Sequence, residues 1–474
     1  MVRSVAVVGG GITGLAAAWE LAGLVRSGEL SVTVYEGSDR VGGKLRLEEV
    51  GGSSVDVGAE SVLARRPEAL TLIDELGLEH RRTHPATVGA TIVSRGQRWP
   101  MPSGTVMGVP SDPESVRGLL TDDEVLRLGQ EQLQAVGAGP ATDGAAGTAD
   151  VSVGDLVDAR LGRAVTDRLV EPLLAGVYAG HARRISVEMA VPALAAAAAE
   201  GQSLLAVARA AQLAARAAPA SVLPVFATLV GGLGGLPVAL AAALAAAGVQ
   251  VHTSRVAREL RADGDGWVVS TGPTTDVVEE RHDAVILAAP ARPASRLLAD
   301  LAPSSAALLS SVDYASVAII TLAVAGRPDV LEGSSGFLVP PVEGLTIKAA
   351  TFSTSKWPWL ADAHPERSWL RASVGRQGEE ASLQHDDDTL AATALADLRT
   401  VLGGLPDPVD VHVRRWGGGL PQYAVGHHAL VDAARAGLPP TLALAGAAYD
   451  GVGIPACIAS GRAAARAVAS PRRP

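Results

Sequence analysis

Three glycines near the N-terminus have the spacing of a phosphate-binding turn. Gly9, Gly11 and Gly14 follow the apolar run 5–8 and open a run of small residues typical of a helix. In such a unit the first glycine permits the tight turn, the second lets the backbone approach a pyrophosphate, and the third lets helix and strand pack closely. Free N–H groups and the positive end of the helix dipole then bind the phosphates. The pattern predicts a dinucleotide site in this turn, which also contains Gly10, Ile12 and Thr13.

An acidic residue follows at the distance that ribose binding requires. Residues 32–36 have the composition of a second strand and end in Glu36, and both Glu36 and the following Gly37 are predicted to contact the cofactor. A carboxylate about 20 residues beyond the last glycine of such a turn binds the ribose hydroxyls. The alternative is an ordinary glycine turn before a helix, but strand, turn, helix and acid in this order favour the nucleotide site. A second glycine pair, flanked by Arg40 and Lys44, would bring positive charge to the phosphates.

The composition limits what kind of protein carries these residues. The 474 residues are 48% hydrophobic and 19% charged, which is enough for a large core and two or three lobes. The single cysteine, Cys457, excludes an internal disulfide and a cysteine-based metal cluster, and it suits a reducing cytoplasm. The net charge of −10 argues against a general nucleic-acid surface. Only three of the 40 basic residues are lysines, a bias typical of GC-rich coding, and the early strand at Val5 predicts no signal peptide.

The order of the predicted elements gives an α/β fold with three parts. A discontinuous Rossmann-like dinucleotide domain is predicted for residues 1–85, 221–292 and 409–474. A mixed-sheet substrate domain is predicted for 86–112 and 293–408, with one strand over 91–98. A helical lobe is predicted for 113–220, with a Gly- and Ala-rich flexible loop at 138–149.

Two segments are considered as a membrane-spanning helix and as a metal site. The alanine-rich stretch 190–218 is interrupted by Glu200, Arg209 and Arg216, so it predicts no transmembrane segment. One face of it is apolar, which leaves a packed helix or a peripheral membrane face open, although bulky aromatic anchors are lacking. The pair His427-His428 is interpreted as the solvated start of a helix, and no metal site is predicted.

Six stretches spread over nearly the full length resemble the bacterial porphyrinogen oxidases, the protoporphyrinogen and coproporphyrinogen oxidases of the flavin amine oxidase superfamily. GGGITGLAAA at 9–18 and RVGGK at 40–44 are shared across that superfamily. EPLLAGVYAG at 171–180, LPQY at 420–423 and GVGIP at 451–455 are more specific, and WPMPSG at 99–104 accompanies them. The resemblance implies that the dinucleotide is FAD.

The resemblance also implies two further turns at the flavin. The turn Gly58-Ala59-Glu60-Ser61 would lie beside the ring, although in the family its second position often carries Pro and its third Asp or Arg, and a simple surface turn is the alternative. The turn at 451–455 would direct a helix N-terminus at the N1/O2 edge and stabilise reduced flavin, unless that helix only completes the sheet. Further implied cofactor contacts are Lys44, the backbone of Val256, Trp416, Val452, Gly453 and Ile454.

The reaction implied by the resemblance is oxidation of a porphyrinogen by six electrons, in three two-electron steps, with oxygen reoxidising the flavin to give hydrogen peroxide. Coproporphyrinogen III, oxidised to coproporphyrin III in haem biosynthesis, is favoured over protoporphyrinogen IX. The substrate-side candidates are Glu60, Arg66, Val177 and Phe337, and the solvated start of the Pro67 helix is the alternative place for Arg66. A downstream chelatase is a possible transient partner. The rival functions are a flavin amine oxidase, which 3% aromatic residues disfavour, a carotenoid-type desaturase, and a non-enzymatic FAD-stabilised porphyrin carrier.

Overall fold

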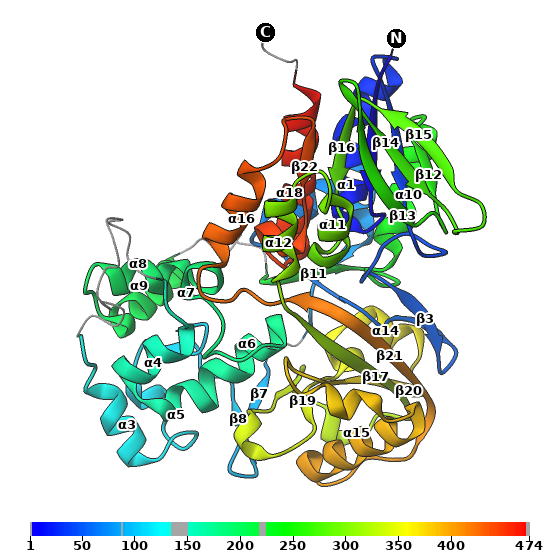
Figure 1. Cartoon of the computed structure of the whole chain (residues 1–474). Coiled ribbons are helices and arrows are strands. Elements are labelled where there is room, and N and C mark those ends of the chain that lie inside the picture. The colour runs from blue at the N-terminus through cyan, green and yellow to red at the C-terminus, as the bar shows by residue number, and fades with distance from the viewer. Residues whose placement is uncertain (1, 87–88, 134–149, 218–223, 471–474) are drawn as a thin grey trace.

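The computed structural model describes residues 2–86, 89–133, 150–217 and 224–470. It consists of two lobes, one containing both ends of the chain and one built from the middle of the chain (Figure 1). The loop predicted at 138–149 lies outside the described residues.

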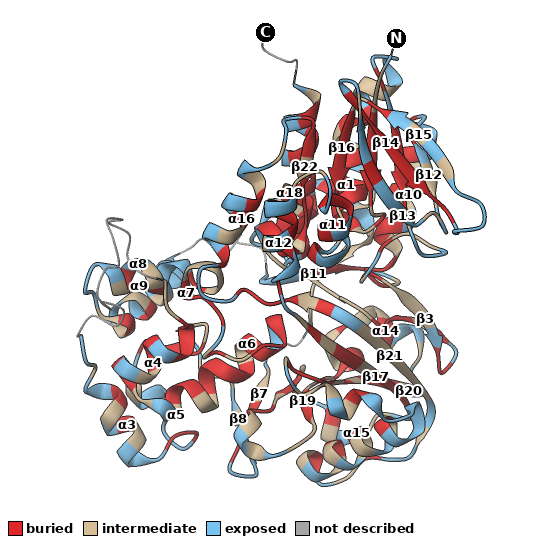
Figure 2. Cartoon of the chain, viewed as in Figure 1, coloured by how far each residue is buried: buried red, intermediate tan, exposed pale blue. Residues whose placement is uncertain are grey.

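The lobe at the chain ends contains a five-stranded parallel sheet, as the Rossmann-like prediction requires. Its strand order is β12-β2-β1-β16-β22. The bounds are β1 (Arg3–Val8), β2 (Leu30–Tyr35), β12 (Gln250–His252), β16 (Ala284–Leu287) and β22 (Leu442–Leu444). Strands from both ends of the chain therefore belong to one sheet, with β16 between β1 and β22. β1, β2, β16 and β22 are buried along most of their length (Figure 2).

Alternating residues of β1 fix the two layers that cover this sheet, because successive side chains of a strand point to opposite faces. Val5 and Val7 pack with α1 (Ile12–Arg26), α2 (Pro67–Glu75), α10 (Gly235–Ala246) and α18 (Ile454–Ala469). Ala6 and Val8 pack on the other face with α11 (Ala291–Leu298), α12 (Pro303–Ser310) and a three-stranded antiparallel sheet. That small sheet consists of β13 (Ala257–Asp263), β14 (Gly266–Thr271) and β15 (Val278–His282).

The second lobe contains a seven-stranded mixed sheet with the order β21-β17-β20-β19-β18-β7-β8. Its strands are β7 (Thr91–Ser94), β8 (Gln97–Pro100), β17 (Tyr314–Ala325), β18 (Gly336–Leu338), β19 (Ile347–Thr351), β20 (Arg367–Val374) and β21 (Pro408–Pro421). Helix α15 (Asp387–Leu402) packs on one face of the sheet. The predicted helical lobe adjoins it and contains α3 (Asp122–Gly129), α4 (Val153–Leu161), α5 (Arg163–Val165), α6 (Glu171–Tyr178), α7 (Val187–Ala190), α8 (Pro192–Ala199) and α9 (Leu204–Ala217).

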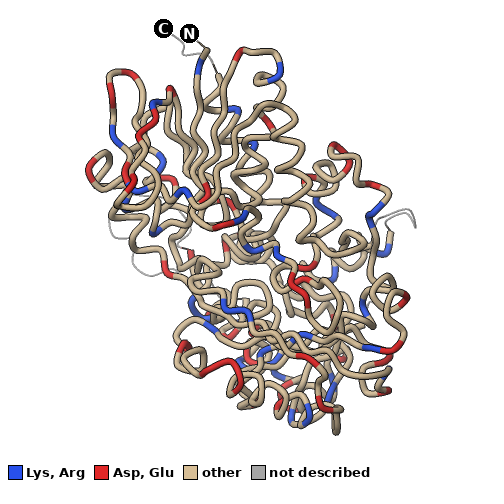
Figure 3. Tube along the Cα trace, turned by 90° about the vertical axis from the view of Figure 1, so that its right-hand side faces the viewer, with Lys and Arg blue, Asp and Glu red and all other residues tan. Residues whose placement is uncertain are grey.

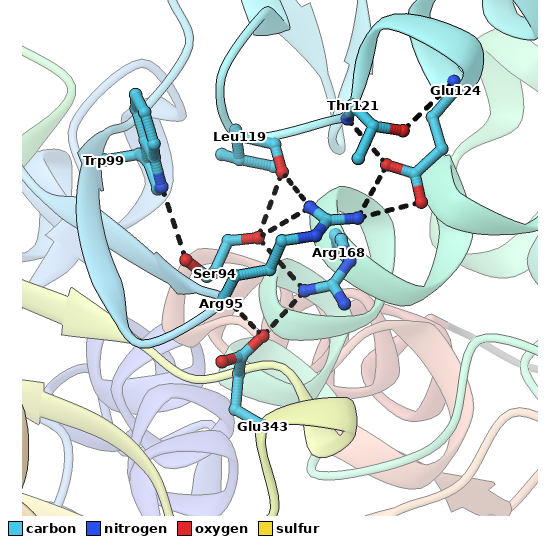
Figure 4. A network of polar contacts seen from close by, with 8 residues as sticks. All are labelled: Ser94, Arg95, Trp99, Leu119, Thr121, Glu124, Arg168 and Glu343. Carbon is cyan, nitrogen blue, oxygen red and sulfur yellow. Dashed lines mark hydrogen bonds and ion pairs between the residues drawn. The ribbon is translucent and has the colours of Figure 1, made fainter.

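Charged side chains join this helical part to the edge of the seven-stranded sheet (Figure 4). Arg168, in the π-helical turn Thr166–Val170, donates to Oε1 of Glu343 at 2.6 Å and to Oγ of Ser94 at 3.0 Å. Arg95 donates to both carboxylate oxygens of Glu124 at 2.9 and 2.8 Å. Elsewhere acidic and basic residues are interspersed along the trace of both lobes (Figure 3).

The structure differs from the predicted boundaries at three places. Residues 409–421, assigned above to the dinucleotide domain, form β21, which pairs with β17 along its length. Residues 293–310, assigned to the substrate domain, form α11 and α12 and pack on the five-stranded sheet instead. The single strand predicted over 91–98 is a hairpin, because Arg95 and Gly96 take positive φ values of 53° and 74° and reverse the chain.

Within the described ranges, every helix is too short or too polar to span a bilayer. The same residues bring together no group of three His, Cys, Asp or Glu side chains suited to a metal ion. His427 differs from its prediction: it is buried in α16 (His427–Ala436), its ring stacks on Tyr423, and Nε2 lies 2.9 Å from the carbonyl oxygen of Ala448. His428, by contrast, is exposed.

Candidate active site

A cleft of about 490 Å³ opens at the carboxyl ends of four strands of the parallel sheet. Ligands of doubly wound sheets bind at this edge, where strand order reverses. Its lining comes from the turns that follow β1, β2, β16 and β22, and it includes Gly9, Gly11, Ile12, Thr13, Glu36, Gly37, Lys44, Ala59, Val256, Val452 and Ile454. Eleven of the predicted cofactor residues thus come together from five separate stretches of sequence.

Each of the three glycines of the first turn lacks a side chain for a different structural reason. Gly9 has a φ of +114°, and a Cβ there would meet the carbonyl oxygen of Ala288 at 2.6 Å. A Cβ on Gly14 would overlap the carbonyl oxygen of Gly9, so the helix passes this strand at backbone contact. Gly11, the N-cap of α1, has ordinary extended dihedrals, and a Cβ there would meet no atom within 4 Å. The space beside Gly11 therefore fits a ligand that needs the bare backbone.

Glu36 is held at the rim of the cleft by backbone donors. The N–H of Gly10 donates to Oε2 at 2.7 Å, and the N–H of Ser38 donates to Oε1 at 2.8 Å. Val256 lies close by, since a Cβ on Gly37 would meet its side chain at 3.2 Å. The carboxylate thus stands where β2 ends, beside the glycine turn.

A second helix begins at the same cleft. Gly453 is the N-cap of α18, and Pro455 occupies its first turn, where a missing N–H costs no hydrogen bond. Val452, Ile454 and Cys457 line the cleft, whereas Gly453 itself does not. The N-termini of α1 and α18 both open at this space, which places two positive dipole ends there.

Lys44 brings a side-chain cation to the cleft. Within the described part of the chain its ammonium has neither a hydrogen-bond nor an ion-pair partner, and burial lowers its pKa. An unpaired cation beside two helix N-termini fits an anionic cofactor with phosphate groups.

A second cavity of about 330 Å³ lies between the seven-stranded sheet and α6. It is lined by Gly58, Glu60 and Ser61 from the turn after β4 (Ser53–Asp56), by Gly176 and Val177 of α6, and by strand residues that include Val317, Ile319, Lys348, Arg371 and Trp416. Four residues line both cavities: Lys44, Ala59, Gly419 and Leu420. The two spaces therefore meet, and a group bound in the first would form a wall of the second.

Glu60 is the centre of an ion cluster in the second cavity. Lys356 donates to its Oε1 at 2.6 Å and Arg371 to its Oε2 at 2.9 Å. Arg371 also donates to the carbonyl oxygen of Gly58 at 2.5 Å, which fixes the turn. Burial opposes ionisation of Glu60, but the two cations outweigh it and lower its pKa to about 2.

The wall formed by α6 is anchored at its far end. The buried carboxylate of Glu171 accepts from the N–H of Ala182 at 2.7 Å and lies 3.0 Å from Nδ1 of His181. Nε2 of His181 lies 2.9 Å from the carbonyl oxygen of Gln377, in the loop after β20. Carboxylate and carbonyl together hold α6 against the sheet, and the ion pair raises the pKa of His181.

The family model of the flavin-containing amine oxidoreductases matches residues 12–469. This chain belongs to that family. A bound flavin in the first cleft therefore agrees with the unpaired Lys44 and the open space at Gly11.

Within this flavoprotein family the chain is similar to porphyrinogen oxidases. The coproporphyrinogen III oxidase of Mycobacterium tuberculosis is 41% identical over 468 residues, with 97% of this chain and 96% of that protein covered. The coproporphyrinogen III oxidase of Bacillus subtilis is 30% identical over 475 residues, with 98% and 97% covered. A crystal structure from Exiguobacterium sp. 255-15, assigned as a protoporphyrinogen oxidase, matches with a TM-score of 0.83 at 29% identity and covers 99% of both chains.

The substrate-side candidates of this flavoprotein separate into two pairs. Glu60 and Val177 line the second cavity, and Val177 is 43% exposed there. Arg66 and Phe337 do not line it. Arg66 is exposed at the start of α2 and pairs with Glu68 at 2.6 Å, because the helix begins at the surface. Phe337 is 1% exposed and packs edge-on against Phe352 on the face of the sheet covered by α15.

Three further predicted cofactor residues lie beside the cavities in different ways. Trp416 lines the second cavity only, and its Nε1 donates to the carbonyl oxygen of Val57 at 3.2 Å. Gly10 and Gly14 line neither cavity. The N–H of Gly10 binds Glu36, and Gly14 lets α1 pack against the backbone of Gly9.

Sequence reasoning missed three basic residues of the site: Lys348, Lys356 and Arg371. Lys348 and Arg371 come from strands of the mixed sheet and Lys356 from the short helix α13 (Ser353–Lys356), and none has a local motif around it. One signal was present, because lysine occurs only three times in the chain and all three lysines lie at these cavities or pair with Glu60.

Proposed function

We propose that the chain is an FAD-dependent coproporphyrinogen III oxidase, which oxidises coproporphyrinogen III to coproporphyrin III with oxygen as electron acceptor. The observation that carries the proposal is the meeting of the two cavities at Lys44, Ala59, Gly419 and Leu420. We call these four shared residues the seam of the two cavities. A flavin ring placed at the seam would face the second cavity. The named relatives at 41% and 30% identity support the substrate class.

FAD, rather than a smaller flavin, is supported by the length of the first cleft. The cleft runs from the rim at Glu36 and Val256 to the seam at Ala59 and Leu420. Glu36 would accept from ribose hydroxyls, and the N-termini of α1 and α18 would stabilise the pyrophosphate and the flavin. The bound flavin supplies a two-electron acceptor for a hydride from a meso carbon of the substrate.

The second cavity suits a large, flat, anionic substrate. Val177 on α6 faces the sheet residues Val317 and Ile319 across it, so apolar surfaces are available for the two faces of a macrocycle. The Glu60 cluster carries one net positive charge when its three members are ionised, which favours carboxylates over amines. For the loss of the hydride, the chain contributes the positioning of the substrate and the exclusion of water.

Protoporphyrinogen IX is the second candidate substrate. The protoporphyrinogen oxidase of Bos taurus is 30% identical over 499 residues, covering 99% of this chain and 98% of that protein. Its substrate carries two vinyl groups in place of two propionates. Each lost charge-assisted contact would cost about 1.5–3 kcal/mol if buried, and much less at an exposed rim.

An amine oxidase is disfavoured by the lining of the second cavity. Amine oxidases hold cationic amines between aromatic side chains, and Trp416 is the one aromatic residue among the described residues that line this cavity. A non-enzymatic porphyrin carrier would need no contact between the two cavities.

The deciding experiment measures peroxide release and kcat/KM with coproporphyrinogen III, protoporphyrinogen IX and putrescine. We expect coproporphyrinogen III to be oxidised with the highest kcat/KM. A preference for protoporphyrinogen IX would overturn the substrate, turnover of putrescine alone would establish an amine oxidase, and no turnover with any of the three would favour the carrier.

The proposal also covers the electron acceptor, a protein partner and the cellular location of the enzyme. Oxygen would reoxidise the flavin and leave as hydrogen peroxide, and a downstream chelatase would receive the product through transient contact. A cytoplasmic location agrees with the single, buried Cys457. Co-purification with a chelatase and fractionation of active cell extracts would test these points.

A further inference from the structure

The distribution of lysine in this chain is not random with respect to the two cavities. Three of its 40 basic residues are lysines. Lys44 lines both cavities, Lys348 lines the second, and Lys356 is bound to Glu60 at 2.6 Å. The basic residues elsewhere in the chain are arginines, and the three lysines all lie at the two cavities or pair with Glu60.

Arginine and lysine differ in one property that matters for catalysis. A guanidinium stays protonated at every physiological pH, whereas a buried lysine readily loses its proton and then acts as a base. Lysine in place of arginine thus permits proton transfer, while either residue would serve as a fixed positive charge. The question is which of the three lysines is placed to be neutral.

The surroundings of Lys348 disfavour a charge on its side chain. It is 4% exposed on β19, at the point where the pairing of β19 with β20 shifts register between Ile347 and Ala349. Its Nζ donates to the carbonyl oxygen of Gly375 at 2.9 Å. Within the described residues no carboxylate lies at ion-pair distance from it, whereas Lys356 has Glu60.

The charged groups on the elements around Lys348 are already engaged with other partners. Arg371 on β20 binds Glu60, and Arg376 in the loop after β20 donates to the carbonyl oxygen of Val339 at 3.0 Å and to Glu379. Asp397 on α15 accepts the N–H groups of Thr346 and Ile347, and Glu171 of α6 is bound to His181. Tyr178 is the other titratable residue of α6. Burial and the neighbouring Arg376 together lower the pKa of Lys348 to about 7, against a weaker opposing effect of Glu379.

We propose that neutral Lys348 is the proton acceptor of the porphyrinogen oxidase reaction, a step that rests on the proposed function. As each hydride leaves a meso carbon with its electron pair, an adjacent pyrrole nitrogen becomes acidic. Its N–H bond breaks, the electron pair stays on the ring and completes a C=N bond, and the proton passes to Nζ of Lys348. The resulting ammonium returns the proton to solvent before the next two-electron step. After the third step a proton moves from the fourth meso carbon to a ring nitrogen, which completes the porphyrin with its two N–H groups.

The other two lysines have different roles by the same reasoning. Lys356 is ion-paired with Glu60, and the pKa of Glu60 is lowered to about 2. Lys44 lies at the seam, where cofactor phosphate or flavin would pair with it. Among the three lysines, Lys348 alone both lines the substrate cavity and donates to a carbonyl oxygen, with no ion-pair partner in the described parts of the chain.

The first test is a titration of the flavin-loaded enzyme that does not depend on turnover. Selective ¹³C labelling of lysine gives three side-chain Cε signals, and Lys348→Arg assigns one of them. We expect the Lys348 signal to titrate between about pH 6.5 and 8. A Lys348 signal that remains that of an ammonium at pH 9 would overturn the proposal.

The second test uses the pH dependence of kcat/KM for coproporphyrinogen III. Wild type should show an acid limb with an apparent pKa near 7, and Lys348→Arg should lower kcat about 100-fold, as loss of a general base does, and remove that limb. Lys348→Gln is the second variant, and its flavin absorbance and melting temperature report on folding. Lys356→Arg is the matched control and should keep the acid limb, whatever its kcat.

The outcomes separate the two proposals. Lys348→Arg with kcat within threefold of wild type would overturn the role as acceptor, because a fixed cation would then suffice. A wild-type enzyme that oxidises no porphyrinogen would overturn the proposed function, while the lysine titration would still show whether Lys348 is neutral. Wild-type activity with loss of the acid limb only in Lys348 variants supports both.

Discussion

Gly14 lies against the carbonyl oxygen of Gly9 so closely that a side chain on Gly14 would overlap it. Gly11, between them, has open space instead. The same turn therefore contains glycines kept for packing of the chain on itself and one kept for the approach of a ligand. Substitutions at the two kinds of position should fail in different ways.

Gly11→Val should abolish flavin retention while the protein stays folded. The new side chain meets no atom of the chain within 4 Å, so the free energy of unfolding should change by about 0.5 kcal/mol. It would project into the space beside the N-terminus of α1, where the pyrophosphate is proposed to bind. Flavin absorbance after purification and the melting temperature of the apoprotein are the measurements. Gly23→Val, on the exposed part of the same helix, is the control and should stay yellow.

Gly453→Asp should lower the reduction potential of the bound flavin. A carboxylate at the N-cap of α18 opposes the positive helix end that would stabilise reduced, anionic flavin. An interaction of about 1 kcal/mol at a helix end corresponds to about 20 mV for a two-electron couple. Spectroelectrochemical titration measures it. Gly453→Asn, of the same shape without the charge, should keep the wild-type potential, and an equal shift in both variants would contradict the placement.

Glu60→Gln should destabilise the protein at neutral pH and flatten its acid sensitivity. The folded-state pKa of Glu60 is lowered to about 2 from 4.5, so its contribution is present above about pH 4.5 and is lost as pH falls toward 2. Removing the carboxylate leaves Lys356 and Arg371 unpaired, at a cost on the order of 3 kcal/mol. Melting temperatures between pH 2 and 7 measure both effects. Glu68→Gln, which breaks the exposed pair with Arg66, is the control and should cost less than about 1 kcal/mol.

Arg66→Ala should leave the preference between coproporphyrinogen III and protoporphyrinogen IX unchanged. Arg66 is exposed, pairs with Glu68 and does not line the second cavity. Arg371→Gln should change that preference, because Arg371 lines the cavity and orders the turn at Gly58. The ratio of the two kcat/KM values measures both variants. If the ratio of the two kcat/KM values changes in Arg66→Ala and not in Arg371→Gln, the contact with the substrate propionates belongs to Arg66 at the start of α2.

Local sequence signals predicted the dinucleotide lobe because its chemistry depends on short-range backbone geometry. The turn at Gly9–Gly14, the acid at Glu36 and the helix start at Gly453 each combine a strand end, a turn and a helix within a few residues. Such units have the same shape wherever they occur.

The residues of the second cavity had no comparable signal. Lys348 and Arg371 point into it because β19 and β20 pair in a particular register, which tertiary packing decides. β21 continues through residues 417–419 as a bulge, since the stretch between Trp416 and Leu420 has two residues more than the stretch between Val317 and Ala315 opposite it. That bulge brings Gly419 to the seam of the two cavities. Arg66 and Phe337 were placed by likeness to relatives, and sequence position alone did not reveal on which side of an element they lie.

The position of β22 and α18 in the sheet has a consequence for how the protein is made. The chain is synthesised from its N-terminus, so β1 and the glycine turn leave the ribosome long before Leu442–Leu444 and Ile454. Until those last segments are synthesised, the parallel sheet lacks an edge strand and the cleft lacks its second helix end. We therefore expect flavin capture to wait until these segments are synthesised, and a premature stop shortly before residue 442 to yield a colourless polypeptide although nine-tenths of the sequence had been built.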